Sequence, residues 1–248
     1  MVTLNLALKE ENTVQNYLYE FLGTAFLVLL GDGVCAGVLL NKTKTNGSGF
    51  IVIAFGWACA VLIPALMFTK SGAVFNPALT IALAAIGKLS WALVPGYVVA
   101  EMLGGLLGGI LVWVMYKDHF AATEDGDTKL GVFCTGPAIR NYTNNFVSEF
   151  IATFVLVFTI LGISQTSVGD VAAVGTFGVG AIILSCGVSL GGTTGYAMNP
   201  ARDFSPRVAH AILPIPNKRN SDWGYSWIPV VAPICGAVVA ALSATAIF

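Results

Sequence analysis

The tripeptide Asn-Pro-Ala occurs twice in this chain, at Asn76-Pro77-Ala78 and at Asn199-Pro200-Ala201, and both copies lie between strongly apolar stretches. Asparagine is a preferred helix N-cap and proline a preferred first helical residue, so each copy predicts a helix start at membrane depth. One such tripeptide alone could be a capped helix or a turn. The pair predicts a pore, because the amides of Asn76 and Asn199 would donate to a passing hydroxyl while the two helix N-termini repel cations and protons.

Arg202 stands three residues beyond Asn199, and Asp203 follows it. A charged side chain facing lipid at the bilayer centre would cost at least about 2.5–3.5 kcal/mol, so Arg202 should face water or a neutralising partner. A fixed guanidinium would hold hydroxyl groups and repel cations. An internal ion pair with Asp203, without a role in transport, is the alternative interpretation.

Two glutamates lie in apolar stretches whose sequences match, Glu20 within 19–26 and Glu149 within 148–154. Such residues could relay a proton or an ion. They could instead accept hydrogen bonds from backbone N–H groups of the segments that lead into the two Asn-Pro-Ala copies. The duplication favours this scaffold role. Asp32 and Glu101 have no counterpart in the other half of the chain, and we assign them no role.

The composition is that of an integral membrane protein. Of 248 residues, 56% are hydrophobic and 10% are charged, and the mean hydropathy is +0.80, so there are too few charges to cover a soluble globule. A span takes about 20 apolar residues, and six stretches predict one: 17–40, 50–68, 91–116, 146–164, 171–190 and 227–248. The first is too long for a signal peptide and is expected to remain in the mature protein.

Charge and cysteine usage argue against other classes of protein. The net charge of −1, with scattered basic residues, gives no site for nucleic acid. The five cysteines lack metal-ligand spacing, and no nucleophile paired with a base indicates an enzyme. We therefore expect no metal, no cofactor and no catalytic residue.

The chain has the pattern of a tandem duplication, with repeats at approximately 16–116 and 146–248 joined by an extramembrane loop at 117–145. Each half holds three spans and one Asn-Pro-Ala copy, and an odd number of crossings turns the second half upside down. Residues 76–87 would form about 18 Å of helix, which reaches only the middle of a hydrocarbon core about 30 Å thick. The expected fold is one all-α channel domain, 1–248, with six transmembrane helices and two half-membrane re-entrant helices in an inverted repeat.

Residues 70–75 and 191–198 lead into the two short helices and contain glycine. Irregular backbone at membrane depth is tolerated only where protein shields it or where it lines water. The carbonyl groups of these two lead-in segments are therefore expected to line the channel.

Together these features resemble the aquaporin, or major intrinsic protein, family. The resemblance rests on the matched openings around Glu20 and Glu149, on 71–73 before the first Asn-Pro-Ala copy, and on 195–203 around the second, and it covers nearly the whole chain. Asp203 after Arg202, where water-selective members carry another residue, is typical of the aquaglyceroporin branch, the glycerol uptake facilitators.

The resemblance implies a passive channel for glycerol, water and other small uncharged solutes such as polyols, closed to ions and protons. It implies a homotetramer in the plasma membrane with cytoplasmic termini and no cofactor. Asn76 and Asn199, followed by Pro77 and Pro200, would be the central donors. The acceptor carbonyls would be those of Gly72, Ala73, Val74, Gly195, Tyr196 and Ala197, and the outer constriction would comprise Phe55, Gly187, Tyr196 and Arg202. Gly187 would widen this constriction for glycerol.

The chain departs from the family pattern in three places. Val74 stands where histidine is common, and Leu79 where valine is frequent. The second-span position of the constriction is assigned to Phe55, with Gly56 and Trp57 as alternatives, because the chain carries an extra residue before Ser71.

The basic residues do not support the implied orientation. Three lysines would lie inside, at positions 9, 70 and 88, whereas eight lysines and arginines would lie outside, at positions 42, 44, 117, 129, 140, 207, 218 and 219. The positive-inside rule expects the opposite distribution. We keep the orientation that the family implies.

Two alternatives remain for the function. A strictly water-selective aquaporin would need a narrower constriction. An ion-coupled secondary transporter also uses inverted repeats and broken helices, but it would need a carboxylate-rich site at the midplane, which only Glu20 and Glu149 could supply. The sequence leaves open whether the channel gates, and whether glycerol, water, lactic acid, dihydroxyacetone, urea or hydrogen peroxide is the physiological solute.

Overall fold

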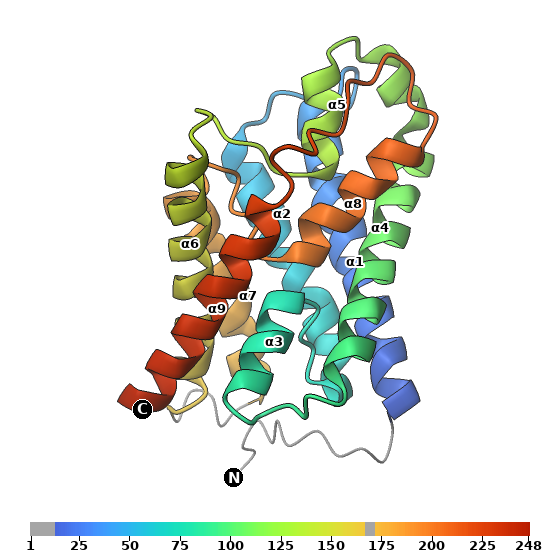
Figure 1. Cartoon of the computed structure of the whole chain (residues 1–248). Coiled ribbons are helices and arrows are strands. Elements are labelled where there is room, and N and C mark those ends of the chain that lie inside the picture. Colours follow the sequence, from blue (N-terminus) through green and yellow to red (C-terminus); the bar gives the residue numbers. More distant parts are fainter. Residues whose placement is uncertain (1–12, 167–171) are drawn as a thin grey trace.

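The computed structural model describes residues 13–166 and 172–248, and this part of the chain is a bundle of helices without strands (Figure 1). The long helices are α1 (Thr13–Leu39), α2 (Phe50–Met67), α4 (Val94–Ala122), α6 (Tyr142–Ile163), α7 (Ala172–Leu190) and α9 (Ile228–Ile247). The shorter ones are η2 (Thr69–Ser71), α3 (Pro77–Ala85), α5 (Gly126–Phe133) and α8 (Pro200–Ile212).

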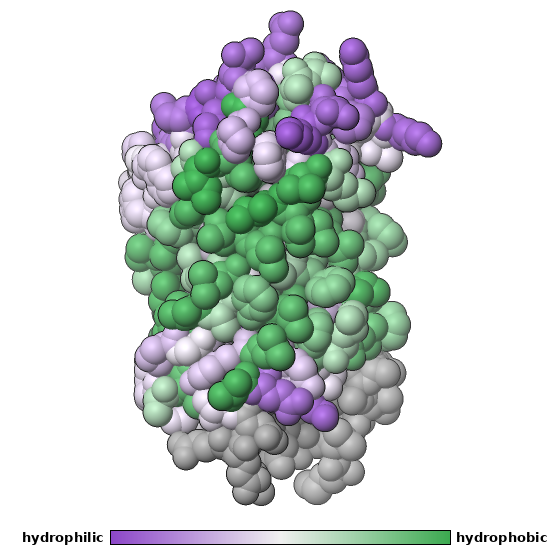
Figure 2. Space-filling view, turned by 90° about the vertical axis from the view of Figure 1, so that its right-hand side faces the viewer, coloured by the Kyte–Doolittle hydropathy of each residue, from purple (hydrophilic) through white to green (hydrophobic). Residues whose placement is uncertain are grey.

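The long helices have the length and apolarity that a membrane requires. In the described residues, α1, α2, α4, α6 and α9 each carry an 18-residue window of high hydropathy, and 175–190 of α7 form a shorter apolar helix. Figure 2 shows the result as a broad hydrophobic band across one face of the molecule, with hydrophilic side chains at its upper end. The expected all-α membrane fold is confirmed.

The two short helices α3 and α8 enter the bundle from opposite ends and meet in its middle (Figure 1). They have 9 and 13 residues, or about 14 and 20 Å of helix, so neither crosses a hydrocarbon core of about 30 Å. The first is shorter than the 76–87 stretch expected from the sequence. It ends at Ala85 because Gly87 adopts a left-handed φ of 73° and closes the turn.

The segment 117–145 is more ordered than the loop that the sequence predicts. Helix α4 kinks at Tyr116 and continues to Ala122, and α5 follows. Asp125 caps α5, its carboxylate accepting from the Thr128 N–H at 2.7 Å. Lys129 is buried and donates to the Pro216 carbonyl, which joins α5 to the loop after α8. Burial lowers the pKa of Lys129.

Glycines set the distance between α1 and α4. A Cβ atom on Gly104 would lie 2.2 Å from the Phe21 carbonyl oxygen, and one on Gly108 would lie 2.8 Å from the Ala25 carbonyl oxygen. Small residues allow membrane helices to approach closely, because lipid supplies no hydrophobic force that would compensate a loose contact. This close contact fixes α1, which carries the buried residues Glu20 and Asp32.

Replacing Gly104 should therefore disrupt the bundle. We expect Gly104→Val to reduce the free energy of unfolding by about 3 kcal/mol or more, because its side chain would meet backbone atoms that cannot move aside. Thermal unfolding of the purified protein in detergent would measure this. Gly33→Ala is the matched control, since a Cβ at Gly33 has no neighbour within 4 Å. Equal melting temperatures for the two variants would contradict the packing argument.

Candidate functional site

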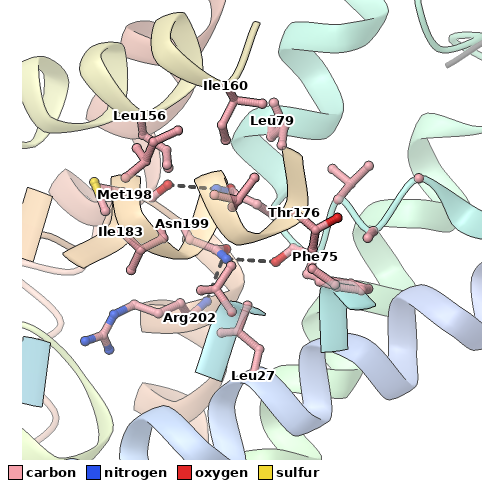
Figure 3. A pocket seen from close by; sticks show the side chains of 18 of the residues that line it. Leu27, Phe75, Leu79, Leu156, Ile160, Thr176, Ile183, Met198, Asn199 and Arg202 are labelled. Atoms are coloured by element: carbon pink, nitrogen blue, oxygen red, sulfur yellow. Dashed lines mark hydrogen bonds between the residues drawn. The ribbon is translucent and has the colours of Figure 1, made fainter. Parts of the chain in front are cut away.

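The two asparagines bind each other's lead-in segments at the middle of the bundle. The Asn76 side-chain amide donates to the Met198 carbonyl at 2.9 Å, and the Asn199 amide donates to the Phe75 carbonyl at 2.8 Å (Figure 3). Each side-chain oxygen caps its own helix, accepting from the N–H of Ala78 at 3.0 Å or of Ala201 at 2.9 Å. The structure thus brings the two predicted donors together.

This reciprocal bond was not foreseen from the sequence, which left both N–H groups of each amide for the pore. A side-chain amide has two N–H donors. One of them joins the two short helices, and no partner for the second is found in the described residues. Asn76 and Asn199 therefore each keep one N–H donor beyond this reciprocal bond.

The lead-in segments have the same unusual backbone in both halves. Three residues of each segment have a positive φ: 92° at Gly72, 52° at Ala73 and 49° at Phe75 in the first, and 86° at Gly195, 42° at Tyr196 and 49° at Met198 in the second. Left-handed non-glycine residues cost about 1–3 kcal/mol each and persist only where the surroundings fix them. The strain indicates that both segments are held by strong contacts.

Glu20 and Glu149 provide these contacts. Glu20 accepts from the N–H groups of Val74 at 3.2 Å and Phe75 at 2.6 Å. Glu149 accepts from the N–H groups of Ala197 at 3.0 Å and Met198 at 3.1 Å, and both carboxylates are fully buried. This geometry matches the scaffold interpretation, because each carboxylate binds two consecutive backbone N–H groups of a lead-in segment.

Glu101 on α4 is a third carboxylate of this kind, although its sequence context gives it no counterpart in the other half of the chain. Its Oε1 atom accepts from the Asn76 N–H at 3.2 Å and from the Thr80 hydroxyl at 2.6 Å. Glu101 therefore has a role around Asn76 although no matching glutamate exists in the other half of the chain. An ionisable residue inside an apolar span is itself a signal, because burying it without partners is costly.

Arg202, Tyr196 and Trp57 line the central cavity, whereas Phe55 does not. Phe55 is 61% exposed on the outside of α2, so its assignment to the constriction is wrong. Trp57, one of the two alternatives, lies inside with its ring centroid 3.8 Å from the Arg202 Cζ atom. Two residues along a helix are about 200° apart around its axis, so an alignment uncertain by one or two residues cannot decide which side chain faces inward.

Gly187 makes room for a ring. A Cβ atom at this position would lie 2.9 Å from the Ala54 Cβ atom and 2.9 Å from the Tyr196 ring. Gly187 is not among the residues that line the central cavity, whereas Tyr196 is. The space left by the missing side chain is therefore filled by Tyr196, which is a different reason for glycine than the open lumen expected from the sequence.

Asp203 does not pair with Arg202, so the alternative of an ion pair between neighbours is wrong. Its carboxylate binds the Arg207 guanidinium at 2.8 Å and accepts from the N–H of Thr135 at 2.7 Å and the Thr135 hydroxyl at 2.6 Å. Arg207 also donates to the Thr135 carbonyl at 2.9 Å. This buried cluster ties α8 to the segment after α5. The i,i+4 spacing of Asp203 and Arg207 was the available sequence signal.

A cavity of 380 Å³ runs beside the two asparagines. The lead-in segments line it with Gly72, Ala73, Val74, Tyr196 and Ala197; Gly195 of the predicted carbonyl ladder is not among the lining residues. Leucine and isoleucine side chains also line it, among them Leu27, Leu156, Ile160 and Ile183 (Figure 3). Among the described residues, the charged ones that line it are Lys70 and Arg202. The cavity thus offers side-chain donors and backbone acceptors together with apolar contact.

Fold and site together define a membrane channel protein: two half-length helices meet inside an apolar bundle, beside a cavity lined by polar backbone. No group of three or more histidines, cysteines or carboxylates that could hold a metal is found in the described ranges. The chain belongs to the major intrinsic protein family, whose sequence model matches residues 7–243.

Known relatives are similar over almost their whole length. A Streptococcus pneumoniae serotype 4 protein named "Glycerol uptake facilitator protein" is 53% identical over 90% of this chain and 95% of its own. A Thermotoga maritima protein named "Probable glycerol uptake facilitator protein" is 52% identical over 91% and 96%. The X-ray structure of the aquaglyceroporin from Plasmodium falciparum superposes with a TM-score of 0.83 at 31% identity, over 93% of this chain and 95% of its own.

Substitution can test whether the ring of Trp57, and not that of Phe55, affects the solute that passes Arg202. Trp57→Leu should change the ratio of glycerol to water permeability at least about threefold, because it removes the ring against which the Arg202 guanidinium rests. Phe55→Leu is the matched control and should leave the ratio unchanged, since Phe55 faces outward. Stopped-flow light scattering of proteoliposomes measures both permeabilities. A change with Phe55→Leu alone would reverse the assignment.

Removing the charge of Glu149 should collapse the second lead-in segment. In Glu149→Gln the N–H groups of Ala197 and Met198 lose a charged acceptor, and each such bond contributes about 1.5–3 kcal/mol. We expect solute permeability to fall at least about tenfold and the melting temperature to drop. Thr159→Val on the exposed side of the same helix is the control, since the Thr159 hydroxyl bonds only within α6. Retained permeability in Glu149→Gln would refute the scaffold role.

Proposed function

We propose that this protein is a passive channel for glycerol, and for water and other small uncharged solutes such as polyols, which excludes ions and protons. The observation that carries the proposal is the pair of N–H donors left at Asn76 and Asn199, beside a cavity that apolar side chains also line. A linear polyol has hydroxyls along one edge and carbon–hydrogen groups along the other, so this mixed lining suits it. The names of the two bacterial relatives support glycerol.

Selectivity for uncharged solutes follows from the fixed charges beside the path. The N-termini of α3 and α8 converge there, and each contributes about half a positive charge. Arg202 adds a full positive charge at the outer constriction, where its donors can hold hydroxyl groups while its charge repels cations. Trp57 and Tyr196 supply apolar faces beside it. A hydrated proton or metal ion meets positive potential at both places.

The alternatives find less support. An ion-coupled transporter needs carboxylate oxygens at the midplane that are free to bind the ion. The oxygens of Glu20 and Glu149 are already occupied by backbone N–H groups. A strictly water-selective aquaporin remains the nearest alternative, and the high identity to glycerol facilitators over nearly complete chains speaks for glycerol.

We further propose that the protein is a homotetramer in the plasma membrane, with both termini cytoplasmic and repeats at approximately 16–116 and 146–248. The matched φ pattern of the two lead-in segments supports the repeats, since equivalent residues lie at one constant offset. Helix α1 begins and α9 ends at the same end of the bundle, which supports placing the two termini on one side (Figure 1). The family supports the tetramer.

Passive transport can be tested directly with purified protein in proteoliposomes. Glycerol influx should follow its gradient, stop at equal concentrations and be unaffected by imposed proton or sodium gradients, because a channel couples to neither. Empty liposomes and liposomes with Glu149→Gln are the controls. Accumulation of glycerol above the outside concentration would establish coupled transport, and water flux without glycerol flux would establish a water-selective channel.

A further inference from the structure

Asp32 on α1 is a buried carboxylate whose place in the channel is unexplained by the scaffold of glutamates. Its side chain is fully buried, and neither oxygen has a hydrogen-bond partner in the described residues. Burying an ionised carboxylate without partners is unfavourable, so Asp32 in its charged form needs a compensating charge. The nearest is Arg202, whose Nη1 atom lies 3.8 Å from the Asp32 Oδ1 atom.

One turn of α1 contacts both the Trp57 ring and the Arg202 guanidinium. Gly31 lets the Trp57 ring pack onto the helix, since a Cβ there would lie 2.2 Å from the ring. The Trp57 Nε1–H group donates to the Cys35 sulfur at 3.3 Å, which fixes the ring. The guanidinium therefore lies against the Trp57 face with Asp32 beside it. The other nearby carboxylate, Asp203, is occupied by Arg207 and Thr135.

The length of the Asp32–Arg202 contact matters for transport. At 3.8 Å the two groups attract each other, but the distance exceeds that of a hydrogen bond. In the described residues no hydrogen bond from the Arg202 guanidinium is found, so its N–H donors remain for a solute. A carboxylate at hydrogen-bonding distance would occupy them. An arginine with no carboxylate nearby would carry an uncompensated positive charge, which is how pores select anions.

We propose that Asp32 is a specificity-determining residue that positions the Arg202 guanidinium and offsets part of its charge, so that the constriction binds uncharged hydroxyls and still repels cations without admitting anions. This inference rests on the proposed role of Arg202 at the outer constriction. Asp32 acts through Arg202 and touches no solute.

The first test removes the charge and keeps the size. In proteoliposomes, Asp32→Asn should raise nitrate permeability and lower the ratio of glycerol to water permeability, each by about threefold or more. Asp32→Leu should have the same effects, because the charge and not the shape is lost. Thr24→Val, a buried position of α1 whose hydroxyl bonds only within the helix, should behave as wild type. Wild-type behaviour of Asp32→Asn would overturn the proposal.

The second test measures stability and needs no transport. Arg202→Val should lower the melting temperature in detergent, because it leaves Asp32 as a buried carboxylate without a counter-charge. Adding Asp32→Asn to Arg202→Val should restore the melting temperature, whereas Thr24→Val in the same background should not. Additive losses in the double variant would overturn the pairing. If wild-type liposomes pass no glycerol, the proposed function fails, while the stability rescue still decides whether Asp32 serves Arg202.

Discussion

Backbone N–H groups at the bilayer centre must find acceptors inside the protein, because lipid offers none. Three buried carboxylates meet this need around the two short helices. Glu20 and Glu149 hold the lead-in segments, and Glu101 holds the first residue of the Asn-Pro-Ala turn at Asn76. Without them the left-handed residues of these segments would relax, and the backbone could not line a cavity.

The same bonds explain why the channel contains so little free charge. A carboxylate that accepts hydrogen bonds from several backbone N–H groups fixes the backbone conformation. Glu20, Glu101 and Glu149 therefore hold the lead-in segments and the Asn76 turn in place and do not form an ion-binding site. The positive ends of α3 and α8 are left to act on the solute, together with Arg202. The reciprocal bonds of Asn76 and Asn199 lock the two halves at this point, so the donors stay fixed relative to each other.

The sequence predicts apolar spans and helix starts more reliably than it predicts which side chains face the cavity or pair with each other. The bounds of α2 and α9 lie within one residue of the predicted stretches 50–68 and 227–248, whereas α4 runs from Val94 to Ala122 and not over 91–116. Apolar length is a local property, and Asn-Pro-Ala defines a cap and a first turn by itself. Phe55 was misassigned because helix phase depends on an alignment precise to one residue. Arg207 was counted only as an outer basic residue, because its partners Asp203 and Thr135 come together through tertiary packing.

The sequence by itself determined the membrane environment, the two helix starts and the family, because apolar runs and capping residues act over a few neighbouring positions. Tertiary structure alone decided which side chain faces Arg202, that Glu101 holds the turn at Asn76, and that Gly187 makes room for Tyr196. These contacts join residues that are far apart in the chain. Their energies change when the distance between two atoms changes by a few tenths of an ångström, and local sequence patterns do not encode such differences.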